Sequence, residues 1–290
     1  MSEIDLSKLP APDVIENTSY EEILSEMVDD LKALDPEITL VESEPSYKVL
    51  QVAAYREMIR RQRDNERVKG LLAAYAKGSE LDHIGVTYYN TPRLTIVQAN
   101  PDASPPVDAV MESDEDYLKR FLLSPDGWST AGPKNAYKYH ALSADADVLD
   151  AVPSTPEPMK VVVTILSRTG NGKASSELID KVFEALSADE VRPQTDLVTV
   201  SSAQIVEYQV SAQLTIEAGP DPEIVRAEAE SSVSKFIAEQ RKIGNTVVRD
   251  ALLSSLYVEG VRRVTLNLTG DVVCNQSSAA HCTSIEVGIS

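Results

Sequence analysis

The sequence predicts an α+β fold, with a helix-rich N-terminal half that carries extended arms and a C-terminal half of small β-α-β sheet units. Apolar residues recur at helical spacing between Tyr20 and Tyr75, whereas the first strongly β-branched run begins at Lys160. The chain has 290 residues, which is more than a single hydrophobic core usually supports. We therefore expect domains at residues 1–90, 91–158 and 159–290, with a division of the last into 159–200 and 201–290 as an alternative.

The N-terminal region predicts an extended arm followed by a helix. Leu9-Pro-Ala-Pro12 indicates the arm, because each proline disfavours the helical conformation of its predecessor. Thr18 or Ser19 is a suitable cap for a helix whose apolar residues recur at helical spacing and which ends before Pro36.

Residues 43–77 form the longest segment of helical periodicity, with Pro45 in its first turn, Gly70 as a break and Gly78 after its end. Its middle is basic, and the cations are Arg56, Arg60, Arg61, Arg63, Arg67 and Lys69. A solvated face with short-range ion pairs is one interpretation. Docking against an acidic surface, for example the N-terminal region of another copy, is the second interpretation, and a bound nucleic acid is the third.

Prolines separate the central elements. The irregular stretch 90–106 is expected to be an inter-domain connection or an extended arm. Two short helices follow at 113–123, capped by Ser113, and at 134–144, with the only tryptophan in the loop 125–133 between them. A second proline cluster is expected to close this half, and its members are Pro153, Pro156 and Pro158.

The C-terminal half alternates strand and helix patterns, which fits either two small sheet units or one sheet covered by helices. The expected strands cover residues 160–166, 197–200, 205–216, 261–268 and 283–289. The expected helices cover residues 175–186, 220–238, with Pro220 at the start, and 247–256.

The charge excludes several classes of function. With 27 basic and 46 acidic side chains the formal net charge is −19, so a general affinity for nucleic acid or anionic lipid is not expected. No apolar run approaches the roughly 18 residues of a membrane span. The acidic N-terminus lacks the apolar core of a secretory signal, so we expect synthesis in a reducing cytosol, with Cys274 and Cys282 as free thiols.

The sequence contains no convincing catalytic, cofactor or metal constellation, so we do not expect an enzyme. The loop 167–173 lies where a phosphate-binding loop would, but Ser167 and Ala174 replace the required glycine and hydroxyl residue. The acids at 114–116 are explained by the helix dipole. Cys274, His281 and Cys282 do not match a zinc motif. A protein that works through its surfaces in an assembly fits these features.

An ordered series of motifs resembles the baseplate assembly protein J family of contractile phage tails. The motifs, in chain order, are Leu9-Pro-Ala-Pro12, Glu42-Ser-Glu-Pro45, Ala54-Tyr-Arg-Glu57, Arg61-Gln-Arg-Asp-Asn65, Leu72-Ala-Ala-Tyr-Ala-Lys-Gly78, Leu81-Asp-His-Ile-Gly85, Glu112-Ser-Asp114, Ser129-Thr-Ala-Gly132, Ile165-Leu-Ser-Arg-Thr-Gly-Asn-Gly172 and Val191-Arg-Pro-Gln-Thr-Asp196.

The resemblance implies a structural wedge, or triplex, component of a baseplate, in a phage or a phage-tail-like bacteriocin. Implied partners are a second copy, a second wedge protein similar to protein I in a helical bundle, neighbouring wedges and a sheath-initiator-like protein. It also implies assembly in the host cytoplasm before incorporation into the particle, a part in triggering sheath contraction, and dimer and inter-wedge contacts of the C-terminal sheet units. The candidate interface residues are Tyr55, Arg56, Arg60, Arg61, Arg63 and Arg67. A cell-wall hydrolase of a tail and an unrelated intracellular adaptor are the alternatives.

Overall fold

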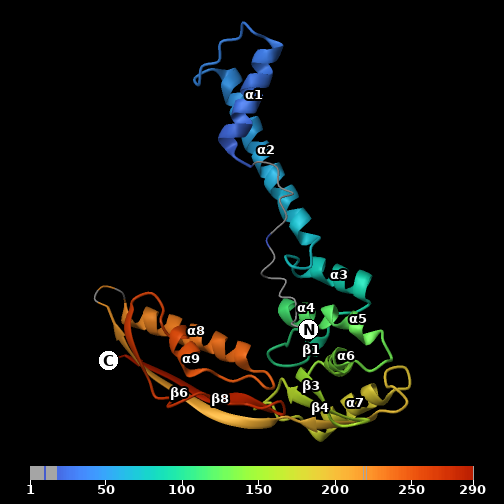
Figure 1. Cartoon of the computed structure of the whole chain (residues 1–290). Helices are drawn as coiled ribbons and strands as arrows, with labels where there is room; N and C mark the ends of the chain where they lie inside the picture. Colours follow the sequence, from blue (N-terminus) through green and yellow to red (C-terminus); the bar gives the residue numbers. More distant parts are fainter. Residues whose placement is uncertain (1–9, 11–17, 218, 220, 290) are drawn as a thin grey trace. The chain divides into compact units, whose positions relative to one another are not determined.

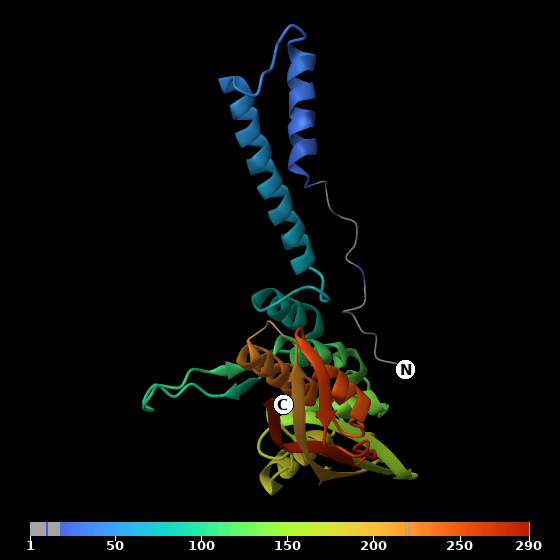
Figure 2. The same cartoon turned by 90° about the vertical axis from the view of Figure 1, so that its left-hand side faces the viewer.

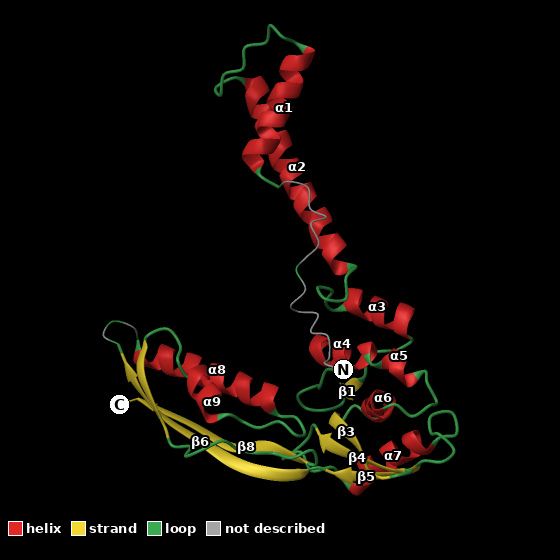
Figure 3. Cartoon of the chain, viewed as in Figure 1, coloured by secondary structure: helices red, strands yellow, loops and turns green. Residues whose placement is uncertain are grey.

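The structure is a computed structural model that describes residues 10, 18–217, 219 and 221–289. The chain divides into two compact units, Met1–Pro92 and Arg93–Ser290, whose elements are shown in Figures 1 and 3. The arm expected at residues 9–12 lies outside the described residues, except for Pro10. Within the described ranges, no helix combines the length and apolar composition that a bilayer crossing requires.

The first unit is built on two helices that pack side by side, α1 (Tyr20–Leu34) and α2 (Pro45–Gly70) (Figure 2). The predicted cap of α1 is confirmed at Ser19, whose Oγ accepts the Glu22 N–H at 3.4 Å. Each helix buries a small set of residues, notably Ile23 and Ala54, and half of the residues of α2 are exposed to solvent.

The break at Gly70 is confirmed, but the helix does not continue to Lys77 as the periodicity predicts. Residues 71–78 form turns, and a further helix that was not predicted, α3 (Ser79–Tyr89), follows them. The side-chain carboxylate of Glu80 packs against Gly70, where a Cβ atom would collide with it. Glycine leaves room for this carboxylate, and the helix ends there although Leu71-Leu-Ala-Ala-Tyr75 has a high helix propensity.

The second unit opens with a β-hairpin made by β1 (Thr95–Val97) and β2 (Val110–Met111). An isolated bridge between Asn100 and Val107 extends the pairing toward the tip. The hairpin projects from its unit in Figure 2, so the proline-rich stretch forms an arm rather than a plain connection. We refer to residues 94–111 as the hairpin arm.

Three helices follow the arm: α4 (Asp114–Leu122), α5 (Ser124–Gly127) and α6 (Lys134–Ala144). The predicted cap of α4 is confirmed, because Ser113 Oγ accepts the Asp116 N–H at 3.2 Å. The short helix α5 was expected to be a loop. It lies against α6, where His140 Nε2 is 3.0 Å from the carbonyl oxygen of Gly127.

The first sheet has the strand order β3-β4-β5. Its strands are β3 (Val148–Glu157), β4 (Lys160–Ser167) and β5 (Leu197–Ser202). Helix α7 (Ser176–Ser187) connects the parallel strands β4 and β5. The proline cluster does not end a domain here, because β3 runs through Pro153 and Pro156 and pairs with β4. Proline is tolerated because β3 is an edge strand.

The second sheet has the strand order β7-β6-β8. Its strands are β6 (Gln204–Ile216), β7 (Val261–Leu266) and β8 (Ser278–Ile289). Helices α8 (Pro222–Gln240) and α9 (Arg249–Ser255) lie on one face of the sheet (Figure 1). Strand β6 alternates between buried and accessible residues from Tyr208 to Leu214, which is the pattern of a strand with one covered face. Pro220 lies outside the described residues.

The strands β3 to β8 therefore form two sheets rather than one, and these two sheets meet within the second unit. Only Ala203 separates β5 from β6. A small apolar core at this junction consists of Leu166, Ala203, Ile243 and Ala279. Two hydrogen bonds cross it, from the Ile243 N–H to Asp150 Oδ2 at 3.1 Å and from Arg241 Nη2 to the Gly170 carbonyl at 2.9 Å.

Candidate interaction surfaces

One face of α2 carries exposed valines followed by arginines. Successive members are separated by three or four residues, so they lie along one side of the helix. We call this surface the basic face, and it consists of Val49, Val52, Arg56, Arg60, Arg63 and Arg67. Val49 is 68% exposed and Val52 is 57% exposed. Exposed apolar and cationic side chains on one stripe are suited to contact with an acidic, partly apolar surface.

Two arginines of the basic face form exposed ion pairs with acids of α2, and within this described helix the other two form none. Arg60 lies 3.7 Å from Glu57 and 3.9 Å from Asp64, and Arg67 lies 3.2 Å from Asp64. Arg56 and Arg63 form no ion pair with any residue that the structure describes. Exposed pairs of this kind contribute little, so a partner's carboxylates can compete for these cations.

Arg61 and Tyr55 occupy other positions on α2. The Arg61 side chain is 21% exposed, its Nε lies 3.2 Å from Glu57 Oε1, and its Nη2 lies 3.8 Å from Glu26 of α1. It therefore links the two helices. Tyr55 is 56% exposed on a neighbouring flank. Of the candidate interface residues, Arg56, Arg60, Arg63 and Arg67 share one face, whereas Arg61 lies on the side toward α1.

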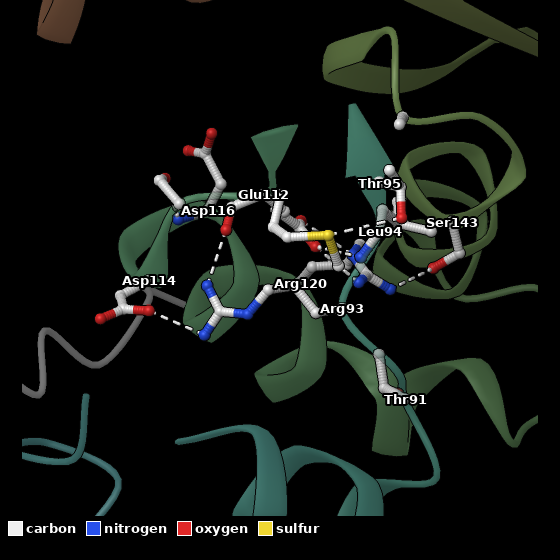
Figure 4. Close-up of polar contacts among 12 residues, drawn as sticks. Thr91, Arg93, Leu94, Thr95, Glu112, Asp114, Asp116, Arg120 and Ser143 are labelled. Atoms are coloured by element: carbon white, nitrogen blue, oxygen red, sulfur yellow. Dashed lines mark hydrogen bonds and ion pairs between the residues drawn. The ribbon is translucent and has the colours of Figure 1, made fainter. Parts of the chain in front are cut away.

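A buried ion pair holds the base of the hairpin arm. Arg120 of α4 donates from Nε to Glu112 Oε1 at 3.0 Å and from Nη2 to Glu112 Oε2 at 2.7 Å (Figure 4). The two side chains are 3% and 5% exposed. Glu112 Oε2 also accepts the Leu94 N–H at 3.2 Å, so one carboxylate joins both strands of the arm to α4.

Arg93 adds a second layer to this cluster. Its Nη1 donates to the Glu112 carbonyl at 2.6 Å, and its Nη2 lies 2.7 Å from Asp114 Oδ1. Its guanidinium carbon lies 4.6 Å from the ring centroid of Tyr117, which is a cation–π contact. We call the cluster the anchor, and it consists of Arg93, Glu112, Asp114, Tyr117 and Arg120. Sequence reasoning missed it because Arg93 and Arg120 lie 27 positions apart. The acids at 112 and 114 were the only visible signal.

The polar groups considered as catalytic candidates have local structural partners. In the turn after β4, Asp147 Oδ2 accepts from Ser167 Oγ at 2.7 Å and Asp147 Oδ1 accepts from the Thr169 N–H at 3.1 Å. In a phosphate-binding loop, groups at these positions would be directed at a phosphate. Here the Ser167 hydroxyl and the Thr169 N–H are directed at the carboxylate of Asp147. Asp116 pairs with Arg168 at 2.9 Å. The turn and the acidic run thus serve the connection between α4 and the first sheet.

The two thiols lie in the core of the second sheet with Tyr208. Burial raises the pKa of both Cys274 and Cys282 above its ordinary value of 9.0, so the thiols are protonated at neutral pH. Burial and the nearby Arg241 lower the pKa of His281. Among the described residues, no three His, Cys, Asp or Glu side chains are grouped so that they could hold a metal ion.

Comparison with known families identifies the class of protein. Residues 42–100 match the baseplate J-like N-terminal domain, residues 129–202 the baseplate J-like central domain, and residues 208–288 the baseplate J-like C-terminal domain. The chain belongs to the baseplate J-like family. It is a structural component of the baseplate of a phage or phage-like particle.

A curated relative agrees over the full length. The chain is 44% identical over 294 residues to Baseplate protein J of Escherichia phage P2, covering 98% of this chain and 97% of that protein. Among solved structures, the chain is similar to a chain of the cryo-EM structure of the anti-feeding prophage baseplate, with a TM-score of 0.40 and 16% identity. That match covers 61% of this chain and 43% of the other.

Proposed function

We propose that the chain is a wedge, or triplex, component that links wedges into a ring around the baseplate hub and transmits the trigger for sheath contraction. Two copies associate with one copy of a second wedge protein similar to protein I through a helical bundle. Neighbouring wedges and a sheath-initiator-like protein complete its contacts. Assembly takes place in the host cytoplasm, and the particle is a phage or an R-type bacteriocin. Its role is structural rather than enzymatic.

The observation that carries this proposal is the basic face of α2. A helix that packs against α1 on one side and presents two exposed valines and four arginines on the other has the composition of an interface rather than of an inert surface. Residues 1–55 carry 13 acidic and 3 basic side chains. Opposite charges on two regions of one chain favour specific orientation when subunits meet.

To transmit the trigger for sheath contraction, the protein requires rigid units that move as a whole. The contacts at the junction of the two sheets in the second unit support this part of the proposal, because an apolar core and two hydrogen bonds cross it. A unit braced in this way carries a displacement from one end to the other, whereas a flexible connection would absorb it.

The experiment is co-purification of the chain with its wedge partner after charge reversal. Arg60→Glu with Arg63→Glu should reduce recovery of the partner, because both side chains lie on the exposed basic face. Arg262→Glu with Arg263→Glu, on exposed positions of β7, makes the same charge change and is the matched control. Unchanged partner recovery with the first variant would contradict a role for the basic face.

A further inference from the structure

The hairpin arm is an exposed element without a core of its own. From Val97 to Met111 every residue except Ala103 is exposed. Four large apolar side chains are 40–49% exposed, and they are Val97, Val107, Val110 and Met111. The only charges in this stretch are two acids, Asp102 and Asp108. The arm therefore presents an apolar surface with a small negative charge.

The anchor holds this arm in a defined direction. Burying the Arg120–Glu112 pair has a desolvation cost that an apolar pair would avoid. The carboxylate bonds both Arg120 and the Leu94 N–H, while the carbonyl of Glu112 accepts from Arg93. These bonds fix both strands at the base of the arm to α4. A pre-oriented, exposed hairpin loses little conformational entropy when it binds a partner.

The basic face of α2 is complementary to the arm in composition and length. Val49 and Val52 precede the arginines along the helix, and in the arm Val97 and Val110 lie nearer the base than Asp102. The basic face spans roughly 27 Å from Val49 to Arg67, at about 1.5 Å per helical residue. The arm spans roughly 26 Å from base to tip, at about 3.3 Å per strand residue.

We propose that the hairpin arm of one copy binds the basic face of α2 in a second copy of the chain. The exposed valines of the two surfaces meet, and Asp102 and Asp108 pair with arginines of the helix, Arg56 and Arg63 first. If each copy contributes both surfaces, a twofold dimer contains the contact twice. This inference rests on the proposed function of the basic face as an interface. It assigns the direct contact of that face to the second copy, so recovery of the wedge partner depends on the dimer that this contact forms.

Charge reversal with rescue tests the contact on the purified chain alone. Sedimentation velocity should show a dimer that weakens on the order of tenfold or more in Asp102→Lys with Asp108→Lys, because two attractive pairs become repulsive. Arg56→Glu with Arg63→Glu should weaken it similarly, and the combined variant should recover the wild-type dimer. The control reverses two exposed acids of α7, Asp180→Lys with Glu184→Lys, and a weakening equal to that of the arm variant would overturn the arm contact.

Cross-linking of two differently labelled chains tests the geometry. Chains carrying Val107→Cys are mixed with chains carrying Val52→Cys and treated with a short bis-maleimide. A cross-linked dimer should form in the mixture and in neither sample alone. The wild-type chain, which carries only Cys274 and Cys282, is treated in the same way and should not be cross-linked.

The possible results distinguish failure of the proposed arm contact from failure of the proposed wedge function. A monomeric wild-type chain, or a dimer insensitive to both charge reversals, overturns the arm contact. So does a dimer weakened by the α2 variant but not by the arm variant, because the basic face then has another occupant. Each of these outcomes leaves the proposed wedge role standing, since that role is judged by recovery of the wedge partner.

Discussion

At the base of the hairpin arm, the Arg120–Glu112 pair differs in kind from the ion pairs on α2. Its side chains are 3% and 5% exposed, whereas Arg60 and Arg67 are 75% exposed. A buried pair is costly to break because the charge that remains is buried and not hydrated. An exposed pair contributes little because water and salt screen it. The two kinds of pair therefore have different uses: the buried one fixes the arm, and the exposed arginines remain available to partners.

Replacing Arg120 tests this difference at a single residue. Arg120→Met leaves the Glu112 carboxylate buried without its cation, so the free energy of unfolding should fall by about 3–5 kcal/mol. Glu112→Gln should also destabilise, and the double variant should lose less than the sum of the two because the pair acts as a unit. Urea denaturation followed by circular dichroism measures these changes. Lys119→Met, at a 54% exposed position of the same helix, should change stability by less than about 0.5 kcal/mol.

The ends of individual helices follow local sequence signals, such as N-cap residues, unless other contacts oppose these signals. Ser19, Ser113 and Ser175 each accept a backbone N–H three residues on, as expected of N-caps. The helix predicted at 134–144 is observed as α6 with the same ends. The end of α2 is the exception, because the apolar periodicity continues beyond Gly70 whereas the helix ends at that residue. Local capping therefore explains where helices start better than where they stop.

The cap of α7 provides a test at this scale. Ser175 Oγ accepts the Leu178 N–H at 3.2 Å, and Ser175→Ala removes this acceptor. We expect a loss of about 1 kcal/mol in the free energy of unfolding, seen as a lower urea midpoint. Ser176→Ala, the same substitution one residue later at an exposed helical position, is the control and should have almost no effect. Equal effects of the two substitutions would show that the cap does not stabilise the helix.

The whole second unit depends on a junction that few residues hold. Asp150 is 9% exposed and accepts the Ile243 N–H at 3.1 Å and the Ala151 N–H at 2.9 Å, while Lys138 Nζ lies 3.4 Å away. One carboxylate thus joins α6, β3 and the segment after α8. Because β5 passes into β6 through Ala203 alone, these contacts determine how firmly the two sheets are held together.

Removing the Asp150 carboxylate should loosen the junction selectively. Asp150→Ala leaves the buried Ile243 N–H without its acceptor, a loss of about 1–3 kcal/mol. Hydrogen exchange should accelerate at residues 241–245 and 168–172, with the interior of α8 unchanged. Asp180→Ala on the exposed side of α7 is the control. Uniform acceleration of exchange across the unit would indicate general destabilisation. Unchanged exchange would show that Asp150 does not stabilise the junction.

The sequence by itself determined the class of fold, the caps of α1 and α4, the β-branched strands and the accumulation of arginine on α2. These features depend on side-chain periodicity and on hydrogen bonds between residues a few positions apart. Only the tertiary structure decided that Arg61 faces α1 while Arg63 faces away, that Arg93 and Arg120 meet at Glu112, and that the C-terminal strands form two sheets. These depend on contacts between residues distant in the chain, which a local pattern does not encode.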